Sequence, residues 1–327
     1  MRKVLFATTA LVALGGVSAA TADISVSAGN EMQYKSWSDS TASTTANNNS
    51  VTNKTKYKIS ASTVTDNGLT LSSYTAQDGT TTGAWNDGGF SIAGDFGTLG
   101  FWGSESGDAF ATATDVTPDE SNTTSTGNVA TTLGSFMPAD ENVAAADVSY
   151  LSPDINGFQF SLGMDQGGTS DATIYGAQYS MTSGDASITV KYAASSGAKA
   201  SAAATDVEAT SLGLVVGYGD MTVTVADNTK KRGSGTGSNG SVYDYSAQSV
   251  GVTYAASDVL TLSAYTGSTE DGKDAAHEIT DTGIGLAYTI TPGLSLSITH
   301  NDWDVKDGTT STNEDGSITT VALDLSF

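Results

Sequence analysis

The last eleven residues, Ser317–Phe327, read SITTVALDLSF and alternate between apolar and polar side chains. Val321, Leu323, Leu325 and Phe327 share one parity, whereas Thr, Ala, Asp and Ser occupy the other. Successive side chains of a β-strand point to opposite faces, so this stretch predicts a strand with one apolar and one polar face. An apolar row at the edge of a soluble sheet would promote aggregation, so the pattern favours a sheet whose apolar face is covered.

The same alternation recurs along the chain, with Ser, Thr and Gly at the intervening positions. It is clear in GFQFSLGMD (157–165), SITVKY (187–192) and SLGLVVGY (211–218). Turn signals separate the expected strands at 66–68, around 97, and at 153–157, 183–185, 219–220, 257–258 and 292–293. Longer polar stretches alternate with these turns, and the longest covers residues 103–145. Strands on both sides of each turn, together with the first and last strands, predict about sixteen antiparallel strands.

Composition limits the compartment and the partners. Arg2, Lys3, the apolar run VLFATTALVALGGV and ATA at 20–22 are typical of a cleaved signal peptide, which we expect to cover residues 1–22. The net charge of −23 argues against a nucleic-acid partner, because phosphates attract Lys and Arg. No stretch after residue 22 approaches the roughly 18 apolar residues of a membrane helix. The chain has no cysteine, so disulfides and thiol chemistry are excluded.

Aromatic residues gather near the ends of the expected strands. The tryptophans lie where strands meet long loops, and several tyrosines lie close to the tight turns. The predicted girdle residues are Trp37, Trp85, Trp102, Trp303, Tyr150, Tyr179, Tyr218, Tyr254 and Tyr288. Two aromatic girdles suit the two interfaces of a membrane, and about ten tilted strand residues span roughly 23 Å. We therefore expect an all-β, transmembrane antiparallel β-barrel in outer-membrane lipid.

Four stretches give the sequence a family resemblance. They are the signal peptide followed directly by a strand, GDFGTLGFWGS (94–104) before the long third loop, DVSYLSPDINGFQFSLG (147–163), and the final VALDLSF. In the third stretch the matching positions are Tyr150, Ser152, Pro153, Gly157 and Phe158. Together these stretches resemble the Gram-negative general porins, which are trimeric, sixteen-stranded diffusion channels of the outer membrane.

The resemblance implies a single barrel domain, residues 23–327, that forms a homotrimer and lets ions and small hydrophilic solutes diffuse passively. It also implies that Phe327 is a signal for the barrel-assembly machinery, and that the third loop, 103–145, folds into the lumen. In the family, acids on this loop face a basic wall. The loop acids here are Glu105, Asp108, Asp115, Asp119, Glu120, Asp140 and Glu141.

Parity supplies the candidates for the basic wall. Tyr57, Ile59 and Ala61 take the lipid side of the second strand, so the lysines between and before them point into the lumen. The predicted wall residues are Lys35, Lys54, Lys56, Lys58 and Lys191. Arg232 is the only arginine after residue 22, whereas the family's wall is rich in arginine. Because lysine is a flexible point charge and arginine a rigid planar one, we expect the electric field at this wall to be less sharply oriented than in the family. The excess of acids predicts cation preference. The alternatives are that the acids belong to a solvated external loop and that the lysines solvate a rim.

Other functions have weaker support. The two histidines, His277 and His300, fit no Ser–His–acid order, so no catalysis is expected. The stretches TEDGKD (269–274) and NEDGS (313–317) could bind Ca²⁺ but lack the spacing of a calcium loop, so no cofactor is expected. Two non-porin alternatives stay open at this point. One is a barrel with a plugged lumen that serves as a structural protein or receptor, and the other is a secreted surface adhesin.

Overall fold

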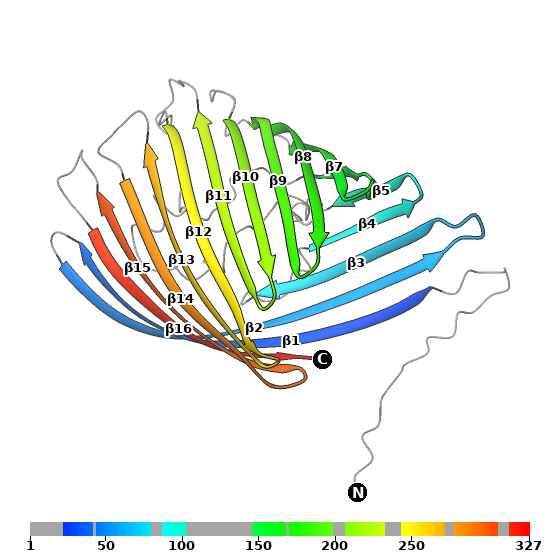
Figure 1. The fold of residues 1–327 in the computed structure, drawn as a ribbon. Helices are drawn as coiled ribbons and strands as arrows, with labels where there is room; N and C mark the ends of the chain where they lie inside the picture. The colour runs from blue at the N-terminus through cyan, green and yellow to red at the C-terminus, as the bar shows by residue number, and fades with distance from the viewer. Residues whose placement is uncertain are drawn as a thin grey trace, which may run out of the picture.

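The computed structural model describes residues 22–41, 44–79, 87–102, 146–167, 170–198, 207–232, 243–271, 278–306 and 314–327. In these ranges the chain forms one closed barrel of sixteen strands (Figure 1). Each strand pairs antiparallel with its neighbours in sequence, and β16 returns to pair with β1. The predicted fold class and strand number are therefore confirmed. Residues 1–21 of the expected signal peptide and the whole third loop, 103–145, lie outside the described residues.

The strands differ in length, and those that flank the third loop are the shortest. The first eight are β1 (Asp23–Thr41), β2 (Thr44–Val64), β3 (Thr70–Gly79), β4 (Asp87–Gly94), β5 (Gly97–Trp102), β6 (Val148–Leu151), β7 (Phe158–Gly167) and β8 (Ser170–Ser183). The last eight are β9 (Ala186–Ala198), β10 (Val207–Tyr218), β11 (Met221–Arg232), β12 (Tyr243–Ser257), β13 (Leu260–Asp271), β14 (Glu278–Thr291), β15 (Leu294–Lys306) and β16 (Glu314–Ser326).

The seven predicted turns all join consecutive strands, and most of them contain a glycine in the left-handed region, of which Gly97 and Gly157 have the least space. Gly97 has φ 106° and Gly157 has φ 88°, a region that side chains with a Cβ rarely occupy. A Cβ on Gly97 would collide with the carbonyl oxygen of Leu151, and one on Gly157 with that of Ser180. These turns therefore let the chain reverse direction while backbone from the next strand packs directly against them.

The barrel closes through a long register between β1 and β16. It runs from Gly29 opposite Ser326 to Ser40 opposite Asp315. Beyond it, the Phe327 amide donates to the Ala28 carbonyl at 2.8 Å, and the Ala28 amide donates to the Phe327 carbonyl at 3.3 Å. The closure that the predicted barrel requires is therefore formed by the last and first strands, and the described strands leave no sheet edge unpaired.

The two faces of the barrel wall have different side chains. The outward parity carries the exposed apolar residues, such as Leu212, Ile284 and Val190, as an apolar surface in contact with lipid requires. The inward parity carries mainly Ser, Thr, Gly and Ala, and many of these residues are buried by the concave wall. The described residues include no helix long and apolar enough to cross a membrane.

Candidate functional site: the luminal wall

Four of the predicted wall lysines lie together on β1 and β2. The antiparallel register places Lys58 opposite Ser27, Lys56 opposite Gly29 and Lys54 opposite Glu31. Lys35 follows on the same face of β1, opposite Ser50. Since the exposed Tyr57 and Ile59 occupy the outward parity of β2, this row of lysines faces the lumen. We call Lys35, Lys54, Lys56 and Lys58 the lysine wall.

Acidic and aromatic side chains share this part of the inner surface. The Nζ of Lys56 lies 4.0 Å from Oε2 of Glu31, with the two side chains 50% and 16% exposed. The Nζ of Lys58 lies 4.3 Å from the centroid of the Tyr74 ring on β3, a distance that suits a cation–π contact. Glu31 and Tyr74 were not among the predicted site residues. The signal that could have found Glu31 is its shared parity with Lys35 on β1.

The fifth predicted lysine does not join the lysine wall. Lys191 lies on the inward face of β9, opposite Gln178 of β8 and Gly213 of β10. In the closed order of strands, β9 is seven positions from β2 and eight from β1, so it lies across the barrel. Beside it, Nε2 of Gln178 donates to Oε1 of Gln159 at 2.7 Å. Lys191 therefore belongs to a separate polar region of the lumen.

The inner face of β13–β15 has a different character. Its inward side chains include Tyr265, Asp281 and Asn301, which are 8%, 1% and 1% exposed. The Tyr265 hydroxyl donates to Oδ2 of Asp281 at 2.7 Å. Gly283 lies beneath this pair, because an added Cβ would collide with the Tyr265 ring and come within 2.5 Å of Oδ1 of Asn301. Apart from Asp281, the described inward side chains of these three strands include no Asp, Glu, Lys or Arg.

The prediction that Trp37 and Trp303 belong to an aromatic girdle facing lipid is wrong. Trp303 is only 7% exposed and packs with Ile279, Val305 and Ile318, and the partly buried Trp37 joins this cluster. The register places Trp37 opposite Ile318 on the inward parity, so both indoles lie on the luminal side of the wall. The prediction relied on their distance from long loops and overlooked their parity. Trp85 and the side chain of Trp102 lie outside the described residues.

The tyrosines near the turns occupy the outward face. Tyr179, Tyr218, Tyr254 and Tyr288 are all exposed, and Tyr218 reaches 65%. Tyr150 shares their parity, and its hydroxyl donates to the carbonyl oxygen of Phe96 in the β4–β5 turn at 2.7 Å. Phe327, the proposed assembly signal, is 78% exposed at the same end of the barrel.

The third-loop acids and the two histidines form no functional site within the described residues. The third-loop acids, Glu105 to Glu141, lie outside the described residues, as does His277. His300 lies on the outward face, where Nδ1 is 2.8 Å from the Thr319 hydroxyl and Nε2 is 3.4 Å from Asp302. Within the described ranges there is no group of three or more His, Asp or Glu residues that could hold a metal ion.

A closed barrel with an apolar outer wall and a polar, partly charged inner wall defines the class of outer-membrane β-barrel channels. The family model for Gram-negative porins matches residues 7–308. The chain belongs to this family, which confirms the resemblance seen in the sequence. The protein is thus an outer-membrane channel and not an enzyme.

Solved structures support the same fold. The outer-membrane channel DcaP of Acinetobacter baumannii is 12% identical, with 96% of this chain and 99% of that chain covered and a TM-score of 0.64. An anion-selective porin from Comamonas acidovorans is 14% identical, with 93% and 100% covered and a TM-score of 0.63. The trimer form of in-vitro folded OmpT from Vibrio cholerae is 14% identical, with 92% and 99% covered and a TM-score of 0.59. No curated protein sequence matches the chain.

Proposed function

We propose that this porin is a passive diffusion channel for ions and small hydrophilic solutes, and that it prefers cations. The observation that carries the proposal is the polar inner wall of a sixteen-stranded barrel. Barrels of this size are too wide for inward side chains to fill, so they enclose water. Small polar and charged side chains along the wall let hydrated solutes pass without losing all their water.

The ion preference depends on which charges reach the conducting path. The net charge of −23 favours cations, and the lysine wall opposes them locally. The shared fold does not decide between cation and anion preference, since one similar structure is an anion-selective porin. In our proposal the third-loop acids, Glu105 to Glu141, narrow the lumen opposite the lysine wall, and their charge exceeds that of the four lysines.

We also propose how the chain is exported, inserted and assembled. The chain is exported with residues 1–22 removed, the barrel-assembly machinery reads Phe327, and the folded protein associates as a homotrimer. The exposed Phe327, which directly follows β16, supports the second step, and the trimer form of a similar outer-membrane protein supports the third.

The test is reversal potential and single-channel conductance in a planar bilayer under a salt gradient. We expect large, stable conductance steps and a reversal potential of the sign that cation flow produces. A Glu105→Gln/Asp108→Asn double variant should move the reversal potential toward zero, because it removes two loop charges. A wild-type reversal potential of the opposite sign would contradict cation preference. Silence from an inserted, heat-modifiable barrel would contradict an open channel and favour the plugged barrel.

A further inference from the structure

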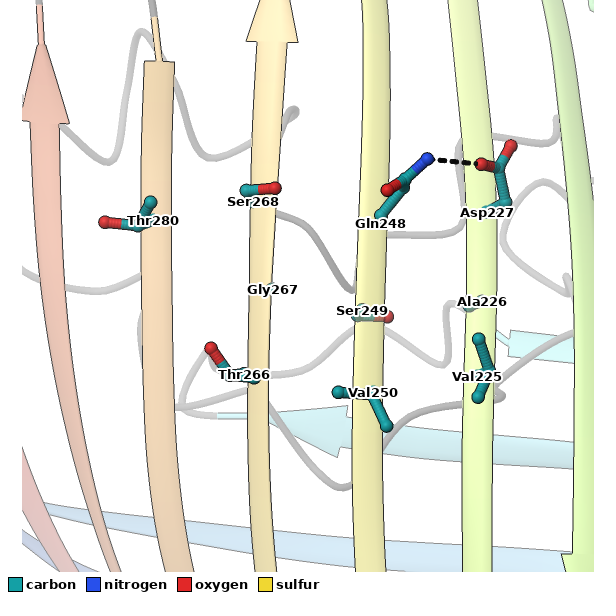
Figure 2. A pocket seen from close by; sticks show the side chains of 10 residues that line it. All are labelled: Val225, Ala226, Asp227, Gln248, Ser249, Val250, Thr266, Gly267, Ser268 and Thr280. Carbon is teal, nitrogen blue, oxygen red and sulfur yellow. Dashed lines mark hydrogen bonds between the residues drawn. The ribbon is translucent and has the colours of Figure 1, made fainter.

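A groove crosses the outer face of β11–β14, on the side of the barrel wall that faces lipid (Figure 2). Its volume is about 580 Å³, within the range of sites that bind small molecules. The outward residues that line it form two neighbouring rows, each paired across the strands. The row nearer the short turns holds Val225, Val250 and Thr266, and the row nearer the long loops holds Asp227, Gln248, Ser268 and Thr280. We call these seven residues the outer groove.

Small outward side chains on β13 create the hollow. Ala264 pairs with Val252 of β12, and Ser268 pairs with Gln248, so at both positions the smaller side chain lies on β13. The surface over β13 is therefore lower than that over β12. A chain of methylene groups can lie in such a depression along the strand.

Polarity changes along the strands at the outer groove. The next row toward the short turns is Val223, Val252, Ala264 and Ile284, and it is entirely apolar. The first row of the outer groove mixes two valines with a threonine, and the second row is entirely polar. On a wall that faces lipid and then water, this change marks the depth at which acyl chains meet head groups. A molecule in the outer groove is therefore amphipathic.

The polar row presents donors and acceptors in a fixed arrangement. Nε2 of Gln248 donates to Oδ2 of Asp227 at 3.0 Å, and Figure 2 shows the two side chains directed toward one another from neighbouring strands. Each of these side chains has a second oxygen that can accept, and Ser268 and Thr280 add hydroxyls that both donate and accept. Hydroxyl groups of a ligand can pair with donors and acceptors alike, whereas an ammonium group can only donate.

The charges around the outer groove disfavour an anionic head group. Asp227 is the one charged residue among the described residues that line it, and the next outward residues on β13 and β14 are Glu270 and Glu278. The lysines on the outward face of β11 and β15, Lys231 and Lys306, already form ion pairs at 3.3 Å and 2.7 Å. A phosphate group in the outer groove would therefore face carboxylates, which repel it.

We propose that the outer groove binds a membrane lipid with an uncharged, sugar-bearing head group. An acyl chain of this lipid lies along β13 toward the short turns, and its sugar hydroxyls pair with the polar row. Because the outer groove is on the outer wall and conduction uses the lumen, the inference is independent of the proposed channel function. Failure of either one leaves the other standing.

The absence of native cysteine allows a fluorophore to be placed beside the outer groove. Ala264→Cys puts a bimane label on β13, one outward position below Thr266, and Val190→Cys on the outward face of β9 is the matched control. The labelled full-length proteins are reconstituted into phosphatidylcholine vesicles that contain one dibrominated lipid at the same mole fraction. This lipid is monogalactosyl diacylglycerol, phosphatidylcholine or phosphatidylglycerol. Bromine quenches the label only at short range, so quenching reports which lipid lies beside it.

At position 264 we expect the galactolipid to bind roughly fivefold more strongly than phosphatidylcholine, as about one net hydrogen bond gives, and phosphatidylglycerol to bind more weakly than both. At position 190 the three lipids should quench equally. Equal quenching by the three lipids at position 264 would overturn the proposal, and so would a galactolipid preference of the same size at position 190. Strongest quenching by phosphatidylglycerol at position 264 would show that the outer groove recognises an anionic head group instead.

Two variants in the Ala264→Cys background test the polar row itself. Ser268→Ala/Thr280→Val removes two hydroxyls and should abolish most of the galactolipid preference. Asp227→Lys reverses the charge and should raise quenching by phosphatidylglycerol above that by phosphatidylcholine. Thr210→Val, on the outward face of β10, is the control and should change neither result. Heat-modifiable migration confirms that each variant is folded, and an unchanged preference in the folded double variant would refute the role of the hydroxyls.

Discussion

The inner surface of this barrel has two unlike walls. The lysine wall on β1 and β2 is charged and accessible, and the side chain of Lys56 is half exposed. The wall on β13–β15 is buried, with Tyr265 bonded to Asp281 above Gly283. Charges in contact with water control the electric field at modest energetic cost, whereas buried polar pairs contribute mainly to stability. Substitutions on the first wall should therefore change conduction, and those on the second should change stability.

Gly283→Ala should have the largest effect on stability. The added methyl group collides with the Tyr265 ring and approaches Asn301, so we expect a loss of about 2 kcal/mol in the free energy of unfolding. The measurement is the urea dependence of barrel unfolding in detergent. Gly29→Ala on the lysine wall is the matched control, since its new Cβ would meet nothing closer than 3.4 Å. Similar losses in both variants would remove the distinction between the walls.

Tyr265→Phe should destabilise the barrel less. It keeps the ring but removes the hydroxyl that donates to Asp281 at 2.7 Å, and leaves a buried carboxyl group without this donor. Loss of one partner from a buried hydrogen bond costs about 1–2 kcal/mol. The same urea titration measures it, and single-channel conductance should stay within the wild-type range. A clear change in conductance with no loss of stability would show that this wall lines the conducting path.

Replacement of all four residues of the lysine wall by glutamine should change stability least. It removes four luminal positive charges, so the ratio of cation to anion permeability should rise roughly threefold to fivefold. Reversal potentials under a salt gradient measure this ratio, and the effect should shrink as salt screens the wall. Lys231→Gln is the control, because that lysine pairs with Asp244 on the outward face at 3.3 Å. An unchanged ratio would mean that ions do not pass near β1 and β2.

Much of the candidate site was predictable because strand parity is a local property. The orientation of Lys54, Lys56 and Lys58 follows from that of Tyr57 and Ile59, and the register bears this orientation out. The same rule, applied to β1, would have placed Trp37 with Lys35 on the luminal side and not in a lipid girdle. The error arose because the prediction used only the distance along the chain from a long loop. That distance indicates how far along the barrel axis a residue lies, but not whether its side chain points to lipid or to the lumen.

Position around the barrel was not predictable in the same way. Nothing local to Lys191 indicates that β9 lies across the lumen from the lysine wall, because that depends on how many strands close the sheet. The Tyr265–Asp281 bond is similar, since it joins diagonal positions of two strands whose register is set by the whole sheet.

The sequence by itself determined the class of fold, the strand number, the turns and the face to which most side chains point. These properties follow from a two-residue repeat and from turn residues that act within a few positions of the chain. Only the tertiary structure decided which charges are neighbours and which wall is buried. Those properties depend on strand register and barrel closure, which bring together residues such as Tyr265 and Asp281, or Trp37 and Ile318, that no local pattern connects.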